Sequence, residues 1–191
     1  MNRLAWIGMA LSFSAWGADI PQALVVRFST VCFTCHEGEC SGRLSFHSGA
    51  QAAQNHVRRY LGSASEREIE AFFALLKYTK EQCAHYPLTA GFPGNGRWEG
   101  ADLAGWHNPV EGGYFIPLGA LDAGEYRLSL TFSGTPQGRA RITDARFDVA
   151  AEESLCRDAT PVLRFKSSGG EHFFHLQGRG DLQRVELMRW K

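Results

Sequence analysis

The spacing of apolar residues changes near Cys83, and this change constrains the fold more than any other feature of the sequence. Before Cys83 the spacing is helical, with apolar side chains on one face of residues 49–61 and of residues 65–80. Ser65 and Glu68 begin the second segment with the pattern of a capping box, which satisfies the first free amides of a helix. The N-terminal half is therefore predicted to be helical.

After Cys83 the chain contains short runs in which apolar and polar residues alternate, as they do in half-buried strands. These runs are residues 114–118, 125–132, 139–149, 162–166, 172–176 and 182–190. Turn residues separate the runs, and the pair Gly169 and Gly170 predicts a hairpin. The pattern is typical of an antiparallel β-sandwich.

These two patterns predict two domains, a small all-α domain at residues 18–83 and an antiparallel β-sandwich at residues 98–191. Residues 84–97 are rich in Pro and Gly and are expected to form a linker. Residues 1–17 are expected to be a signal peptide, because a short apolar run ends in small residues. That run is too short to span a bilayer. We therefore expect export to the bacterial periplasm, without a transmembrane span.

The charge of the chain is balanced, with 20 Lys and Arg residues against 20 Asp and Glu residues. A nucleic-acid-binding protein usually carries a basic patch or an excess of basic residues. No nucleic-acid partner is therefore expected. The sequence shows no catalytic triad, paired carboxylate site or nucleotide-binding loop, so no catalytic residue is assigned.

Cys32, Cys35 and His36 form the motif Cys-x-x-Cys-His. Two thiols at this spacing can each form a thioether with a haem vinyl group, and the adjacent imidazole then binds the iron. A redox dithiol would need a βαβ context, and a zinc site would need a second ligand pair. The sequence has neither, so the motif predicts one covalently bound haem c.

Residues 20–83 resemble a small class I c-type cytochrome domain. A first helix leads into the motif, and residues 65–80 are similar to the terminal helix of that family, which packs across the first one. The resemblance implies an all-α fold, thioether bonds from Cys32 and Cys35, and His36 as the proximal iron ligand.

In that family a Met on a loop before the last helix binds the distal side of the iron. This sequence differs from the family at that position. None of the three methionines lies there. His56 is the preferred replacement, because it falls on the apolar face of its predicted helix, where a buried imidazole needs a partner. His47 is the second candidate. An open iron, or ligation by His85, remains an alternative, and the ligand set decides whether small molecules can bind.

Three cysteines lie outside the haem motif, Cys40, Cys83 and Cys156. An exported protein with an odd number of spare thiols is expected to form one disulfide. A Cys40–Cys83 disulfide is preferred, because it would cross-link two parts of the helical half. Cys83–Cys156 is the alternative, and it would join the two halves.

Residues 98–191 resemble galactose-binding-like and other carbohydrate-binding jelly rolls, through the Gly-Glu-Tyr-Arg-Leu turn and strand at residues 124–128. This resemblance implies a jelly-roll-like sandwich that binds carbohydrate or a partner protein. Trp98 and Trp106 lie in glycine-rich sequence, where an indole could stack on a sugar ring. Core packing is the preferred interpretation of both tryptophans.

Two polar groups in this half are interpreted as ordinary structural residues. If residues 171–176 form a strand, the odd spacing of His172 and His175 places them on opposite faces, so they suit no shared metal. Glu152, Glu153 and Asp158 are expected in a solvated loop.

The function predicted from the sequence is one-electron transfer by a periplasmic monohaem protein with an unidentified redox partner. A gas sensor or peroxidase-like enzyme with an open iron is the first alternative. A glycan-binding cytochrome that delivers electrons to an oxidative enzyme is the second.

Overall fold

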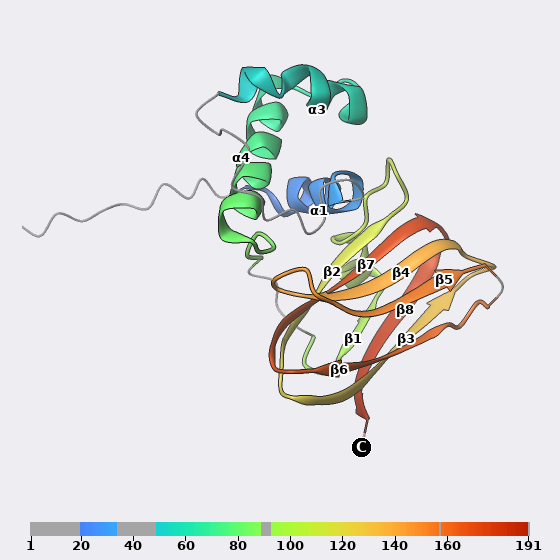
Figure 1. The fold of residues 1–191 in the computed structure, drawn as a ribbon. Helices are drawn as coiled ribbons and strands as arrows, with labels where there is room; N and C mark the ends of the chain where they lie inside the picture. The colour runs from blue at the N-terminus through green and yellow to red at the C-terminus, as the bar shows by residue number, and fades with distance from the viewer. Residues whose placement is uncertain (1–19, 34–48, 89–92, 157, 191) are drawn as a thin grey trace, which may run out of the picture.

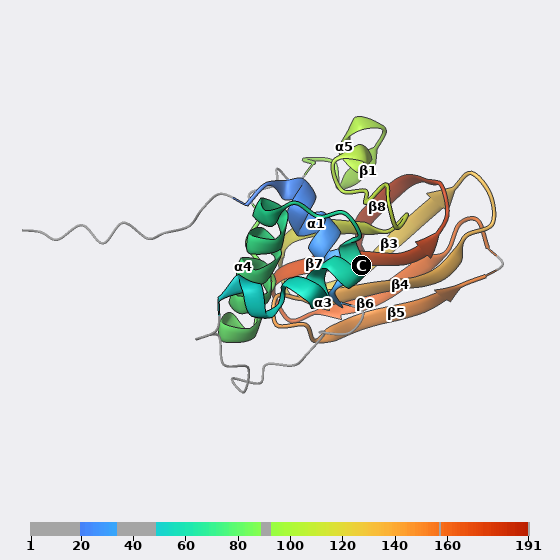
Figure 2. The same ribbon diagram turned by 90° about the horizontal axis from the view of Figure 1, so that it is seen from above.

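The computed structural model describes residues 20–33, 49–88, 93–156 and 158–190. The helical elements in these residues are α1 (Gln22–Val31), η1 (Ala50–Ala52), α3 (Gln54–Leu61), α4 (Glu66–Gln82) and α5 (Ala101–Ala104). The strands are β1 (Arg97–Glu99), β2 (Tyr114–Leu121), β3 (Gly124–Phe132), β4 (Gln137–Asp144), β5 (Val149–Leu155), β6 (Val162–Ser167), β7 (Gly170–Arg179) and β8 (Leu182–Trp190). Strands dominate the fold, and α1, α3 and α4 are grouped at one end of it (Figures 1 and 2). No helix in the described part of the chain is long and apolar enough to cross a bilayer.

The strands form two four-stranded antiparallel sheets. The first sheet has the order β1-β8-β3-β6, and the second has the order β2-β7-β4-β5. The turn at Gly169 connects β6 in the first sheet to β7 in the second, so the predicted hairpin there is wrong. The positive φ angles of Gly169 and Gly170 instead let the chain cross between the sheets.

The predicted single strand at residues 139–149 is also wrong, because it is a hairpin of β4 and β5 in the second sheet. The chain reverses at Phe147, which adopts a φ of 71°. Glu152 and Glu153, expected in a loop, lie in β5. Glu152 forms an ion pair with Arg141 on the neighbouring strand.

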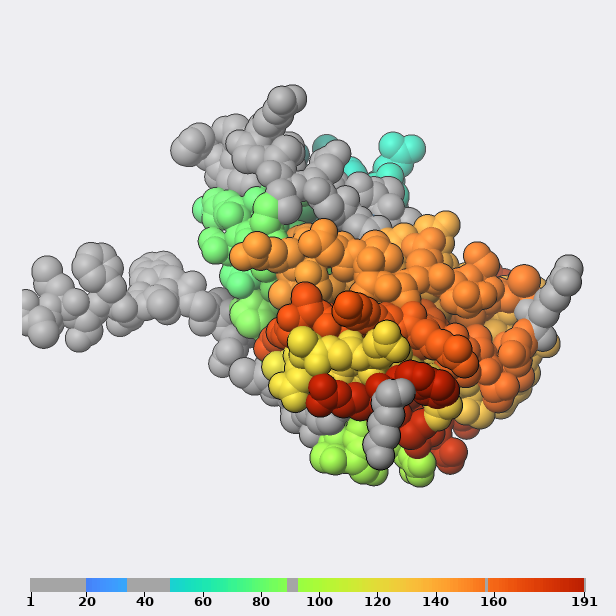
Figure 3. Space-filling model, turned by 60° about the horizontal axis from the view of Figure 1, so that its bottom comes forward, coloured from blue at the N-terminus to red at the C-terminus, as the bar shows by residue number. Residues whose placement is uncertain are grey.

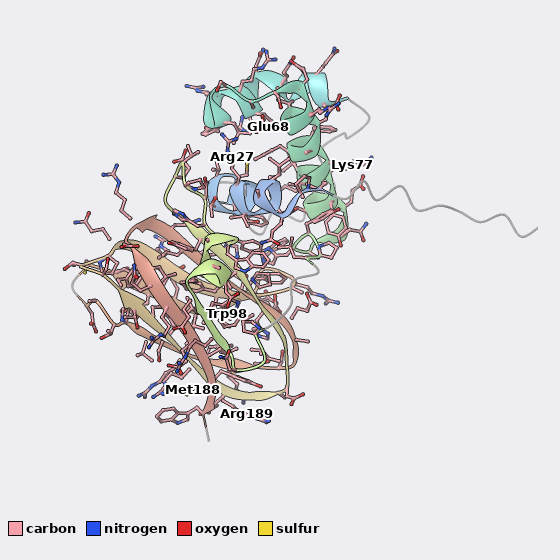
Figure 4. All side chains as sticks on the ribbon, turned by 180° about the vertical axis from the view of Figure 1, so that it is seen from behind. Arg27, Glu68, Lys77, Trp98, Met188 and Arg189 are labelled. Atoms are coloured by element: carbon pink, nitrogen blue, oxygen red, sulfur yellow. The ribbon has the colours of Figure 1, made fainter. Side chains whose placement is uncertain are left out.

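The helices pack on one another through α1 and α4. The capping box predicted at the start of α4 is confirmed, because Ser65 accepts from the Glu68 amide and the Glu68 side chain accepts from the Ser65 amide. Arg27 of α1 reaches Glu68 at 3.3 Å and donates to the carbonyl of Leu61 at 2.9 Å (Figure 4). One arginine thus links three helical elements.

Helix α1 also packs directly on the second sheet. Buried Asn108 donates to the Thr30 hydroxyl of α1 at 2.8 Å. Gly113, which precedes β2, allows this approach, because a Cβ there would lie 2.8 Å from the Leu176 carbonyl oxygen and 3.2 Å from the Thr30 side chain. The helix and the sheet are therefore too close for any larger residue at this position.

The second sheet is buried on both faces at β7. All five residues from His172 to Leu176 in β7 are buried. His172 lies near Phe165 of the first sheet, whereas His175 lies near Phe33, which follows α1. The two histidines thus face opposite sides of β7, as their spacing predicted.

The expected separate all-α domain is wrong, and with it the resemblance to a class I cytochrome c domain and the two-domain fold class built on that resemblance. The structure is predominantly β, and the buried side chains of its helices and sheets belong to one core. The physical reason is the apolar outer face of the second sheet, which needs a cover. The segment that begins with α1 supplies that cover. The two antiparallel sheets agree only in general content with the β-sandwich expected for residues 98–191.

Candidate haem site

A small apolar hollow, open to solvent, lies among α1, α3 and α4. It is lined by Phe28, Cys32, His56, Val57, Tyr60, Leu61, Phe72 and Leu76. These residues come from α1 and the residue that follows it, and from α3 and α4, which lie later in the chain. The hollow therefore exists only when the helices are packed together.

The position of Cys32 follows from the geometry of α1. Its amide donates to the carbonyl of Phe28 at 2.8 Å, so Cys32 continues the helical face on which Phe28 lies one turn earlier. Phe28 in turn meets Phe72 of α4 edge to face, with ring centroids 5.8 Å apart. The first thiol of the Cys-x-x-Cys-His motif is therefore part of an aromatic wall.

His56 lies at the rim of the same hollow. Its helix α3 buries Val57 and Leu61, whereas His56 and Tyr60 are exposed, with their ring centroids 5.0 Å apart. The sequence argument expected the imidazole to be buried, and the structure instead leaves it accessible beside an apolar surface. His56 and Cys32 nevertheless line one cavity. They are 24 positions apart in sequence, so the packing of the helices brings them together.

Several predicted site residues lie outside the described residues, namely Cys35, His36, Cys40 and His47. Their proposed roles stay predictions. Cys83 is disulfide-bonded, and Cys40, the partner expected for it, is among those residues. Cys156 is an exposed free thiol, so the alternative Cys83–Cys156 pair is not present.

Phe33, the second residue of the motif, anchors this region to the second sheet. It is 4% exposed and lies in a cluster of aromatic rings. Its centroid is 5.1 Å from that of His85, 5.2 Å from that of Phe147 and 5.9 Å from that of His175. The motif thus begins between an apolar hollow on one side and the sheet on the other.

The two histidines in this cluster are held neutral by burial. Desolvation, assisted by the nearby Arg141, lowers the pKa of His175 to about 3. Desolvation, assisted by His175, also holds the pKa of His85 well below its ordinary value. His85 Nε2 lies 3.0 Å from the Thr143 hydroxyl, and His85 is not among the residues that line the hollow.

The tryptophans proposed for sugar stacking are buried. Trp98 is 2% exposed and Trp106 is 7% exposed, in agreement with the preferred interpretation as core residues. Figure 4 shows Trp98 within the body of the sandwich. His107 stacks on Tyr114 with ring centroids 4.5 Å apart. Neither tryptophan offers a sugar-binding platform.

The described residues contain no group of three or more His, Cys, Asp or Glu side chains that could hold a metal ion. The cluster of Phe33, His85 and His175 was not among the residues predicted from the sequence, although one signal of it is present there. The run at residues 172–176 is almost entirely apolar and aromatic, as in a strand that is buried on both faces, and it was interpreted as alternating.

A scan against protein-family models finds no match to this chain, and a search of curated proteins finds no significant match. The function is therefore argued from the site alone.

Proposed function

We propose that this protein is an exported one-electron carrier with one haem c, attached to Cys32 and Cys35 and held through iron by His36. One observation supports this proposal most strongly. Cys32, the first residue of the attachment motif, lies in the wall of an apolar hollow formed by three helical segments. A haem linked to this thiol would meet that hollow directly.

The residues of the hollow suit a haem. Phe28, Phe72 and Leu76 offer apolar surface for a porphyrin face, and burial of the iron from water is one of the means by which a protein sets the haem potential. When bound, the haem supplies the one-electron chemistry. The chain supplies the walls, and the contacts of Arg27 with Glu68 and with the Leu61 carbonyl hold those walls in place.

His56 is the proposed distal ligand. It is the histidine among the residues that line the hollow, and its imidazole is accessible. A neutral imidazole nitrogen is a good ligand for iron, and two histidine ligands would favour electron transfer over the binding of small molecules. His47 remains the competing candidate.

Haem attachment is tested by expressing the full chain in a periplasm that matures c-type cytochromes. We expect a covalent haem that survives denaturing electrophoresis. Cys32→Ser should weaken or abolish attachment, whereas Cys156→Ser, which changes an exposed thiol outside the motif, should retain it. Absence of covalent haem from the unsubstituted protein would overturn the proposal.

The ligand set is tested by the optical spectrum of the reduced protein with and without carbon monoxide. We expect a low-spin spectrum that carbon monoxide does not change. His56→Ala should convert it to one that responds to carbon monoxide, and His47→Ala should not. A response in the unsubstituted protein would instead favour an open iron and a role in ligand binding.

A further inference from the structure

The outer face of the first sheet carries a cluster of cations around one indole. Residues at alternate positions of β3, β6 and β8 point outward there, because Tyr126, Leu128 and Leu187 between them are buried. We call this cluster the Trp190 face. It consists of Arg127, Arg164, Lys166, Met188 and Trp190. In Figure 3 the strands of this sheet follow one another as red-orange β6, yellow β3, dark red β8 and green β1.

Two like charges of this face are directly opposite each other. Arg127 of β3 pairs in register with Arg164 of β6, and like charges at such positions repel. Neither arginine has an ion pair with a described carboxylate, and the buried Nε of Arg127 has no hydrogen-bond partner. Elsewhere on the same sheet the arginines are neutralised, Arg97 by Glu186 and Arg184 by Glu99. Glu125 of β3 also points outward, in register with Lys166 and with Trp190, and the charge of Glu186 acts on Arg127. The opposed guanidiniums of Arg127 and Arg164 still retain a positive charge that an anion would neutralise.

Trp190 adds an apolar surface to this charge. Its side chain is 43% exposed, and that of the neighbouring Met188 is 37% exposed. The guanidinium carbons of Arg127 and Arg164 lie 5.4 and 4.9 Å from the centroid of the Trp190 ring. These cation–π contacts hold both guanidiniums beside the indole. The face thus combines exposed aromatic surface with paired donors for a carboxylate.

We propose that the Trp190 face binds an acidic polysaccharide whose sugar rings carry carboxylates. A guanidinium binds a carboxylate through two parallel hydrogen bonds, and an indole offers apolar surface to the C–H groups of a sugar ring. A polyuronate presents both features on each ring. One of its carboxylates would match the opposed guanidiniums of Arg127 and Arg164, whereas Lys166, the next cation on β6, lies opposite Glu125.

The position of the face favours a polysaccharide over a redox protein. Met188 and Arg189 lie at the end of the molecule opposite Arg27 and Glu68, with the sandwich between them (Figure 4). A redox partner must approach the haem hollow among the helices. A polysaccharide bound at the far end would hold the protein at a surface while that hollow stays accessible. The binding proposal rests on the Trp190 face alone, and only the choice against a redox protein rests on the proposed haem hollow.

The test is affinity electrophoresis of the full chain in gels that contain polygalacturonate, with fully methyl-esterified polygalacturonate as the matched uncharged polymer. We expect retardation by the first polymer alone, and its loss at high salt. Arg164→Gln and Trp190→Ala should each weaken binding by about tenfold. Arg184→Gln removes the same charge from an ion-paired position on the same sheet and should bind normally. Circular dichroism checks that each variant is folded.

Three results would overturn the proposal. The first is equal retardation by the esterified polymer, and the second is no retardation by either polymer. The third is equally tight binding of poly-glutamate that also depends on Arg164, because the face would then recognise acidic proteins. Loss of haem binding in any variant would not bear on these outcomes, since the polymer assay reads only mobility.

Discussion

The two sheets have the same number of strands, but their outer faces differ in exposure to solvent. The outer face of the first sheet carries charged and exposed side chains, including Arg164 and Trp190. The outer face of the second sheet carries Phe115 and Phe173, each 2% exposed or less, beneath His85 and Phe33. The first outer face is exposed to solvent, whereas the second is covered by the N-terminal segment over β2 and β7 and is exposed at β5.

This difference explains why the helices do not form a domain of their own. A sheet with an apolar outer face gains by burying it, and the hydrophobic free energy is roughly proportional to the area removed from water. Helix α1 and Phe33 provide that burial, while α3 and α4 pack on the far side of α1 and form the hollow. The candidate haem site therefore depends on the second sheet, although none of its lining residues belongs to a strand.

The largest effect is expected for Phe173→Ala on the covered face. The Phe173 ring stacks on Phe115 and lies 4.3 Å from the His85 ring centroid, so its loss should lower the free energy of unfolding by about 4 kcal/mol. The exposed Val162→Ala on the first sheet should change it by about 0.5 kcal/mol. Urea unfolding followed by circular dichroism and by tryptophan fluorescence measures both. Separate transitions for helices and sheets would contradict the shared core.

Acid should also destabilise the protein, through His175 on the covered face. Its folded pKa of about 3 lies below the ordinary value of 6.5, so below that value the unfolded chain binds a proton that the folded chain does not. Stability should therefore fall by about 1.4 kcal/mol for each pH unit between those two values. His175→Gln should reduce the slope, as measured by urea unfolding at a series of pH values. An unchanged slope would show that the imidazole is not buried in a neutral state.

A medium effect is expected for Asn108→Ala, which removes the buried hydrogen bond to Thr30. Thr30 keeps its own bond to the Val26 carbonyl, so the loss should be about 2 kcal/mol rather than more. Ser133→Ala removes an exposed hydrogen bond to Asp181 and serves as the control, with a loss of about 0.5 kcal/mol. Thermal unfolding compares the two. Equal effects would mean that α1 is not fastened to the sheet at this point.

The smallest effect is expected for Arg164→Gln on the exposed face. Removing one of two opposed guanidiniums relieves repulsion but also loses a contact with Trp190, so the free energy of unfolding should change by less than about 0.5 kcal/mol. Thermal unfolding in low and high salt measures it. A large destabilisation would show that Arg164 contributes to the stability of the fold. The exposed face would then not differ from the covered face in its effect on stability.

Parts of this fold could be predicted from local pattern alone. The capping box at Ser65 and the opposite orientations of His172 and His175 follow from rules that involve only near neighbours in sequence. The order of the strands could not be predicted in this way. The turn at Gly169 has the residues of a hairpin, but whether the next strand pairs with β6 or crosses to the other sheet depends on the whole set of partners.

The sequence by itself determined that Cys32, Cys35 and His36 lie close together in the chain, at a spacing that predicts haem attachment. Only the tertiary structure decided what surrounds that motif. It placed Cys32 and His56 around one apolar hollow, and it buried Phe33 against His85 and His175. The reason is physical. Covalent spacing is local, whereas the choice of which apolar faces cover one another is made by all the buried surfaces together.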